Sequence, residues 1–492
     1  MKRFLPLFCV ALALASSAIA QVPVSSNPAL ASIDDLPRSA FPALDMTRIT
    51  AEDALADYKG NPGGVRYAIP QKVFVTPERD GLWESLDADR MVWRYRITAA
   101  DAKSLNLGFG RYWMPAGGSL SIYASSLKTG IGPFTEADNE IHRQLWTPLI
   151  LSNDLLIEVI VPHAKRADLQ LELRQVGFGY RAFGVAPKAC KSGSCNMDVA
   201  CLGADDPWQE NRRAVGAMSS GGSRFCTGSL LNNTRKNRRM LFATATHCEI
   251  TAANAASLVV VWNFDAPQCR APGSASSGSN AVVGPTNQFQ SGAIFLGQTN
   301  NPFVDPPAAF PAGSRSDFTL VELDDPANPA HRLFWAGWNR GAAAAQCSAS
   351  QLCASIHHPD GDEKRITYSR TPLAAAGIYN ATGVHWFVQW DSNPPRLPNI
   401  PAGAPNPPPG VTEPGSSGSP LYNAQRQLVG VLSGGASFCT AGVGDLNDEY
   451  GMLNHAWNGL PAPNAMNAYL DPINSGALGI NGVDLFGDGF GG

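Results

Sequence analysis

The sequence is poor in charge and has no excess of either sign. Only 16% of its 492 residues are charged, against about 25% in an average globular chain. The 37 basic and 41 acidic residues leave a net charge of −4. Such a chain lacks the positive surface that binds nucleic acid or an anionic membrane. We therefore expect no nucleic acid and no membrane among its partners.

Long hydrophobic runs are absent after the first 20 residues, which excludes a membrane-spanning helix there, since such a helix needs about 20 apolar residues. At the start of the chain, Lys2 and Arg3 precede an apolar stretch over 4–15, and small residues follow up to Ala20. This pattern is typical of a secretory signal peptide. We predict that residues 1–20 are removed and that the protein is secreted.

Cysteine is missing between Cys9 and Cys190, although the chain holds ten cysteines in total. Within this gap, apolar and polar residues alternate over 91–97, 155–161 and 169–176. An alternation of period two predicts half-buried strands. The sequence therefore indicates a separate β-rich domain that ends near the small, basic segment 188–193, where proteases readily cut.

The remaining chain has little helical periodicity. Short apolar runs alternate with turns, in keeping with the 48 glycines and 38 prolines of the whole chain. Regularly spaced short strands of this kind predict an all-β sandwich or barrel.

Ser417 lies in the most distinctive motif, Glu-Pro-Gly-Ser-Ser-Gly-Ser-Pro at 413–420. Glycines on both sides of a serine allow a tight bend that exposes the hydroxyl and lets the N–H groups of Gly415 and Ser417 converge into an oxyanion hole. A simple hairpin turn is the alternative. The motif does not match the Gly-x-Ser-x-Gly elbow of α/β-hydrolases, because Ser419 takes the last glycine position and a strand follows.

His247 follows the apolar run 240–246 and precedes Cys248. A serine hydroxyl needs a nearby imidazole to take its proton, and His247 is the candidate. A disulfide from Cys248 to Cys226 would hold the loop that bears this base. A histidine after a strand can also be merely a packed or surface residue.

Asp317 opens a predicted strand at 318–323 and is the candidate that orients the imidazole. The order His247, Asp317, Ser417 is that of chymotrypsin-type enzymes and differs from the order in subtilisins and α/β-hydrolases. Other aspartates that precede strands or lie in turns stay open as alternatives: Asp265, Asp305, Asp324 and Asp325.

The motifs at 245–248, 315–320 and 415–420 resemble those of the trypsin-like serine proteases, and the segments 194–199, 226–234, 333–338, 356–359 and 412–415 are similar to the secreted bacterial lysyl endopeptidases. This resemblance implies two six-stranded antiparallel β-barrels over 192–482. The glycine-rich end of the chain predicts a flexible tail over 483–492. The resemblance also implies that 21–191 is a propeptide that assists folding and masks the cleft. We expect a cut after Lys191, and a monomeric mature enzyme.

The same resemblance implies that Asp448 lies at the base of the pocket for the residue before the scissile bond, with Asp445 and Glu449 as close alternatives. A buried carboxylate there favours Lys or Arg. The family stacks a tryptophan on a histidine beside the cleft. Here the histidine position is Ser433 and the tryptophan position falls near Tyr379, so a strict choice of lysine over arginine is left open.

Removal of Cys9 and Cys190 with the leader and propeptide leaves eight cysteines. The resemblance implies the pairs Cys195–Cys439, Cys201–Cys269 and Cys226–Cys248, and Cys347 with Cys353 then remain as a local pair. His357 and His358 have no cysteine, histidine or aspartate at metal-ligand spacing around them. We expect no metal and no cofactor.

These observations predict a secreted serine endopeptidase that forms an acyl-enzyme and cleaves protein or peptide substrates after lysine, with arginine as the alternative. Two other functions stay open. One is an endopeptidase with a different preference at this position, because Ser433 and Tyr379 alter the cleft. The other is a catalytically silent, secreted binding protein on the same fold.

Overall fold

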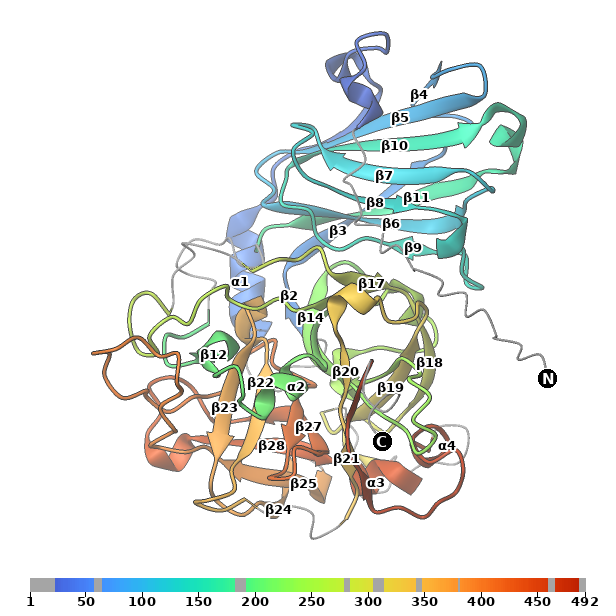
Figure 1. Ribbon diagram of the computed structural model, residues 1–492. Coiled ribbons are helices and arrows are strands. Elements are labelled where there is room, and N and C mark those ends of the chain that lie inside the picture. Colours follow the sequence, from blue (N-terminus) through green and yellow to red (C-terminus); the bar gives the residue numbers. More distant parts are fainter. Residues whose placement is uncertain are drawn as a thin grey trace, which may run out of the picture.

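The computed structural model describes residues 23–56, 64–181, 192–277, 284–303, 314–341, 347–378, 381–458 and 465–485. The predicted signal peptide, the cut site at Lys191 and Tyr379 lie outside these residues. Figure 1 shows a β-rich N-terminal region above a larger C-terminal body. The described helices are short, and none of them is both long and apolar enough to cross a bilayer. They are α1 (Met46–Ala56), α2 (Trp208–Arg212), α3 (Leu453–Asn458) and α4 (Asn467–Leu470).

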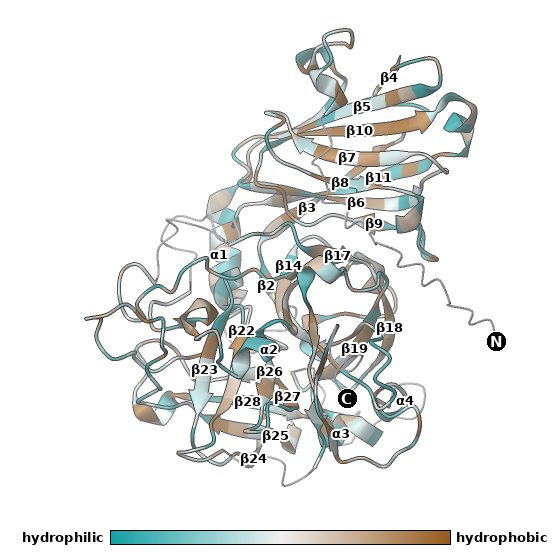
Figure 2. Ribbon diagram, in the orientation of Figure 1, coloured by the Kyte–Doolittle hydropathy of each residue, from teal (hydrophilic) through white to brown (hydrophobic). Residues whose placement is uncertain are grey.

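The N-terminal region is a sandwich of two sheets around one apolar core. The larger sheet consists of β1 (Arg38–Phe41), β4 (Leu82–Ser85), β5 (Arg90–Ala99), β7 (Ser119–Ala124), β8 (Gly130–Phe134) and β10 (Asp154–Pro162). The smaller sheet consists of β3 (Ala68–Val75), β6 (Ser104–Trp113), β9 (Leu145–Trp146) and β11 (Gln170–Gly179). The strands predicted from alternation are β5, β10 and β11. β10 is central in its sheet and buried along most of its length, and it is mostly hydrophobic apart from Asp154 and Glu158 (Figure 2).

The C-terminal body contains two large sheets, and the all-β fold class is confirmed. The first consists of β13 (Val215–Ser220), β14 (Arg224–Leu230), β15 (Leu241–Ala245), β16 (Val259–Trp262), β17 (Phe289–Ser291), β18 (Ala293–Gln298) and β19 (Phe318–Leu323), with β2 (Val65–Arg66) added from the N-terminal region. The second consists of β12 (Met197–Asp198), β21 (Trp338–Asn339), β22 (Cys353–His357), β23 (Arg365–Ser369), β24 (Ala374–Ile378), β25 (Ala381–Gln389), β26 (Pro420–Tyr422), β27 (Leu428–Gly435), β28 (Asn447–Met452) and β29 (Gly479–Ile480). Six strands per barrel are not confirmed, because short edge strands enlarge both sheets.

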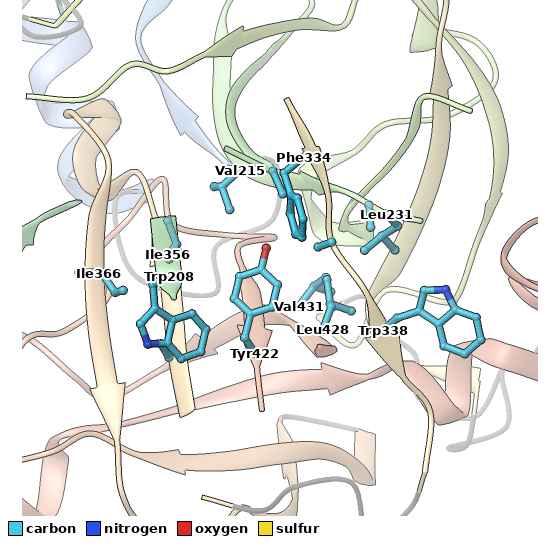
Figure 3. Packing of buried hydrophobic residues seen from close by; sticks show 14 of the residues in the cluster. Trp208, Val215, Leu231, Phe334, Trp338, Ile356, Ile366, Tyr422, Leu428 and Val431 are labelled. Atoms are coloured by element: carbon cyan, nitrogen blue, oxygen red, sulfur yellow. The ribbon is translucent and has the colours of Figure 1, made fainter. Parts of the chain in front are cut away.

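A shared apolar core joins the two large sheets. Val215 of the first sheet lies in the same cluster as Ile356, Tyr422 and Val431 of the second, and Figure 3 shows these side chains facing the space between the sheets. The interface between the sheets is therefore part of the hydrophobic core, and loops at its margin are held at fixed positions.

The flexible tail predicted from residue 483 starts too early. β30 (Val483–Asp484) pairs with β20 (Phe334–Trp335), and Val483 is buried in the core of the first sheet. Burial of this apolar side chain and the strand pairing hold the segment to the domain.

Candidate active site

His247 and Asp317 are brought together by the pairing of β15 with β19. Ala245 lies opposite Phe318 in this antiparallel ladder, so the residue after one strand meets the residue before the other. The Thr246 N–H donates to the Asp317 carbonyl at 3.1 Å and continues the ladder into the site. The local β pattern thus determines the first pair of the predicted triad.

The Asp317 carboxylate holds the His247 imidazole through two hydrogen bonds. His247 Nδ1 lies 2.6 Å from Oδ2, and the His247 backbone N–H donates to Oδ1 at 2.9 Å. Both side chains are fully buried. Asp317 has φ 55°, a left-handed conformation that is uncommon outside glycine. This conformation aims the carboxylate back at the imidazole and fixes the tautomer with a proton on Nδ1.

Gly451 allows the Asp317 loop to contact the second sheet. A Cβ at Gly451 would lie 1.7 Å from the Ser316 carbonyl oxygen, a distance that no side chain tolerates. The backbone just before Asp317 therefore lies directly against β28 of the second sheet. This close approach was missed in the sequence, where Gly451 is one of many glycines.

Ser417 lies on a tight turn before β26, next to β14. The Thr227 N–H of β14 donates to the Ser417 carbonyl at 2.8 Å. Gly418 has φ 79°, and a Cβ there would lie 2.2 Å from Thr244 Oγ1 and 2.5 Å from the Thr227 carbonyl oxygen. Only glycine fits this position, and it seats the serine turn against β14 and β15.

His247 Nε2 is buried and has no hydrogen-bond partner among the described residues. The structure thus brings His247 and Asp317 into contact but does not form the bond between His247 and the Ser417 hydroxyl. A general base has to come within about 3 Å of the proton that it removes, and such bonds often tighten only when substrate binds.

The backbone amides of Gly415 and Ser417 donate to no described residue, whereas those of Ser416, Gly418 and Ser419 donate within the turn and to β27. Gly415 has φ 90° and is buried. These two amides, one of them the N–H of Ser417 itself, are suited to bind a developing oxyanion.

Asp448 lies in β28 and is fully buried. Its Oδ2 accepts hydrogen bonds from Thr412 Oγ1 at 2.8 Å, Ser437 Oγ at 2.7 Å and Trp390 Nε1 at 2.5 Å. Thr412 precedes the serine turn, and Ser437 follows β27. The carboxylate is therefore held between the two segments that flank the serine, whereas Asp445 is exposed and Glu449 is half-buried.

Ser433 lies in β27, buried, where its hydroxyl contacts His385 Nε2 of β25 at 3.1 Å. Burial lowers the pKa of His385 to about 4, so this imidazole is neutral at physiological pH. His385 was not predicted from the sequence, because a histidine inside a strand carries no local signal of its neighbours.

Ser416 and the paired histidines 357 and 358 have structural partners. His357 Nδ1 lies 2.8 Å from Ser416 Oγ, and His358 Nδ1 lies 2.9 Å from the Asp362 carbonyl oxygen. Burial lowers the pKa of His358 to about 3. His357 thus contacts the serine turn through the Ser416 hydroxyl. Among the described residues, no group of three or more His, Cys, Asp or Glu is placed to bind a metal ion.

Four disulfides join the pairs Cys195–Cys439, Cys201–Cys269, Cys226–Cys248 and Cys347–Cys353. These are the pairs expected from the sequence. The bond from Cys226 to Cys248 connects β14 to the short helix that bears His247. This disulfide therefore links the segment that bears His247 to the strand that contacts Ser417.

The family model "Lysyl endopeptidase, C-terminal domain" matches residues 189–451. The chain belongs to the lysyl endopeptidase family. Lysyl endopeptidase of Pseudomonas aeruginosa is 28% identical over 439 residues, which cover 83% of each chain. The family assignment makes this chain a serine endopeptidase that acts on proteins or peptides, and the match contains all three predicted triad residues.

Two solved structures are similar to about half of this lysyl endopeptidase family member. A Glu endopeptidase in complex with MPD has a TM-score of 0.29 and 12% identity, and the match covers 52% of this chain and 90% of that chain. Deg5 has a TM-score of 0.27 and 13% identity, with coverage of 50% and 87%.

Proposed function

We propose that the protein is a secreted endopeptidase that cleaves after lysine, with arginine as a weaker alternative, through Ser417, His247 and Asp317. Ser417 attacks the peptide carbonyl and His247 takes its proton. His247 then returns the proton to the leaving amine, and water hydrolyses the acyl-enzyme. The N–H groups of Gly415 and Ser417 stabilise the oxyanion.

The burial of Asp448 carries the proposal for basic specificity. Its carboxylate has no exposed surface and is held by residues on both sides of the serine turn. A substrate ammonium that reaches this region would gain an attraction to the buried carboxylate that a neutral side chain does not make.

We predict that Asp448→Asn lowers kcat/KM for a lysyl anilide by about 10²- to 10³-fold, the equivalent of a lost buried ion pair. Asp445→Asn is the matched control, since Asp445 lies three residues away and is exposed. The assay compares lysyl, arginyl and glutamyl anilides, with Ser417→Ala as the inactive reference. Equal lysyl activity in the Asp448 and Asp445 variants would refute the assignment.

The proposed maturation removes 1–20 as a signal peptide and 21–191 as a propeptide, so that the enzyme starts at Ser192. Two contacts at this start support the boundary. Ser192 is buried, and its Oγ lies 2.7 Å from Asp362 Oδ2. The Gly193 N–H donates to both oxygens of Glu413, at 3.1 and 2.9 Å. The start of the catalytic region is thus bound to Glu413, which precedes Ser417 by four residues.

N-terminal sequencing of the protein from culture medium tests this maturation. We expect the sequence to begin at Ser192, and we expect Ser417→Ala to keep the 21–191 segment attached if the enzyme cuts its own chain. A start well inside 21–191 would disprove the boundary. Gel filtration of the same sample is expected to show a monomer.

A further inference from the structure

One edge of β14 is shared between the catalytic region and the N-terminal region. Along one side, β14 pairs with β13 from Arg224 to Ser229. Along the other side, it pairs with β15 only at Ser229 and Leu230, and with β2 at Arg224 and Phe225. β2 thus extends the first catalytic sheet as an added strand, beside β14 in Figure 1.

The position of β2 is next to the serine turn. Thr227, two residues beyond the β2 contact, donates to the Ser417 carbonyl at 2.8 Å. Phe225 Cδ1 is 3.1 Å from the place of a Cβ on Gly415. Cys226 is bonded to Cys248, the neighbour of His247. The part of β14 that pairs with β2 is therefore adjacent in sequence to the part that contacts Ser417 and the His247 segment.

β2 also has a defined direction along this edge. Val65 lies opposite Phe225, Arg66 lies opposite Arg224, and the Tyr67 N–H donates to the Ser223 carbonyl at 2.9 Å. The chain thus runs away from Ser417 as its residue numbers rise. A peptide that passes Ser417 and adds a strand to a free sheet edge would use the same backbone groups.

We propose that β2 occupies the subsites for the substrate residues that follow the scissile bond, so that the N-terminal region inhibits the protease as a strand in the place of substrate. This inference rests on the proposed function, because it requires Ser417 to be the nucleophile. The occupant is a segment of the same chain, and a peptide substrate displaces it.

Two groups of contacts hold β2 in this place. An apolar cluster across the interface contains Val65, Tyr67, Ala68, Ala217, Phe225 and Phe264. The Arg66 side chain binds α1, with Nε 3.0 Å from Asp53 Oδ1 and Nη1 3.0 Å from Glu52 Oε2. The Tyr180 hydroxyl donates to Asp53 Oδ2 at 2.6 Å. The strand is therefore anchored by the N-terminal region and presented to β14.

Gly64 offers a specific way to displace the strand. It has φ 69°, and a Cβ there would lie 2.5 Å from the Phe225 carbonyl oxygen and 2.9 Å from Cys226 Sγ. Gly64→Ala therefore pushes β2 away from β14. Gly117→Ala is the matched control, because Gly117 has φ 79° but its Cβ would meet only Pro162, at 3.4 Å. Val65→Pro is a second variant, which removes a backbone N–H from the paired strand.

The experiment uses the full chain with Ser417→Ala, which binds peptides but does not cut them. Two labelled peptides are titrated by fluorescence anisotropy: one with lysine in the middle and three residues after it, and one that ends at a lysine amide. We expect Gly64→Ala and Val65→Pro to tighten binding of the first peptide by about 10-fold or more. We expect no change for the second peptide, and none in Gly117→Ala.

Hydrogen exchange over residues 223–227 provides a readout that does not depend on peptide binding. We expect faster exchange in both β2 variants and renewed protection when the longer peptide is added. Unchanged peptide affinity and unchanged exchange in both variants would overturn the inference. If the processed wild-type enzyme cleaves lysyl anilides at the same time, the proposed function survives. Absence of lysyl cleavage by that enzyme overturns the proposed function instead.

Discussion

Among single residues, Asp317 has the most direct effect on the site, because its carboxylate holds the His247 imidazole. Both of its oxygens accept hydrogen bonds from His247, one from the ring and one from the backbone. Full burial makes these bonds strong, since no water competes for them. In the proposed mechanism, Asp317 acts through His247 as a positioning residue, because it selects the tautomer that leaves Nε2 able to accept the serine proton.

We predict that Asp317→Asn lowers kcat of the mature enzyme by about 10⁴-fold with little change in KM, because an amide stabilises the wrong imidazole tautomer. Asp324→Asn serves as the control, since Asp324 was an alternative candidate and contacts His142 of the N-terminal region. Steady-state kinetics on a lysyl anilide measures kcat and KM for both variants. A similar loss in both variants would show that Asp317 has no special role.

At the scale of elements, the loop between β8 and β9 meets β17 and the residues after β19 across an acidic cavity of about 210 Å³. Its lining includes Asp138 and Glu140 from the N-terminal side and Asp325 from the catalytic side. Burial and the nearby carboxylates of Asp138 and Glu140 raise the pKa of Asp325 to about 7. His142 lies beside this cluster, with Nε2 2.7 Å from Asp324 Oδ2. Like charges thus face each other across the interface.

We predict that the 21–191 segment separates from the processed protease more readily as pH rises from about 4 to 7. The raised pKa means that the interface favours protonated Asp325, so its contribution is complete near pH 4 and is lost as pH rises through about 7. Gel filtration of the processed enzyme at pH 5 and pH 8 measures the separation. Asp325→Asn is expected to reduce the difference, and an unaltered pH dependence in that variant would contradict the explanation.

At the scale of the whole molecule, the disulfides differ greatly in the length of chain that they close. Cys195–Cys439 spans 244 positions and connects the start of the catalytic region to the segment after β27. Cys347–Cys353 spans only 6. Since cross-linking distant positions removes more entropy from the unfolded chain, the first bond contributes more to the free energy of unfolding.

We predict that replacing Cys195 and Cys439 by alanine lowers the free energy of unfolding by about 3 kcal/mol more than replacing Cys347 and Cys353. Urea unfolding of full-length chains that carry Ser417→Ala, which prevents self-digestion, measures both effects. Equal destabilisation by the two double substitutions would show that loop length does not control these contributions.

Sequence patterns predicted the all-β fold class, the family, and the strands of the N-terminal region that appear as β5, β10 and β11. The fold class and the strands are visible because period-two alternation and turn residues are local, whereas the family was indicated by the resemblance of short motifs. The proximity of His247 to Asp317 follows nearly as directly, because each residue adjoins an end of one of two paired strands. Three disulfide pairs agree with those that the family resemblance implied, and Cys347–Cys353 is the pair that then remained.

The contacts between distant segments became evident only in the three-dimensional fold. It places Gly451 under the Asp317 loop, His385 against Ser433 and β2 on the edge of β14. It also extends the folded domain to β30. A two-residue strand and single buried glycine or histidine residues have no periodicity of their own. Their positions depend on packing between sheets that lie far apart along the chain, so local sequence patterns do not reveal them.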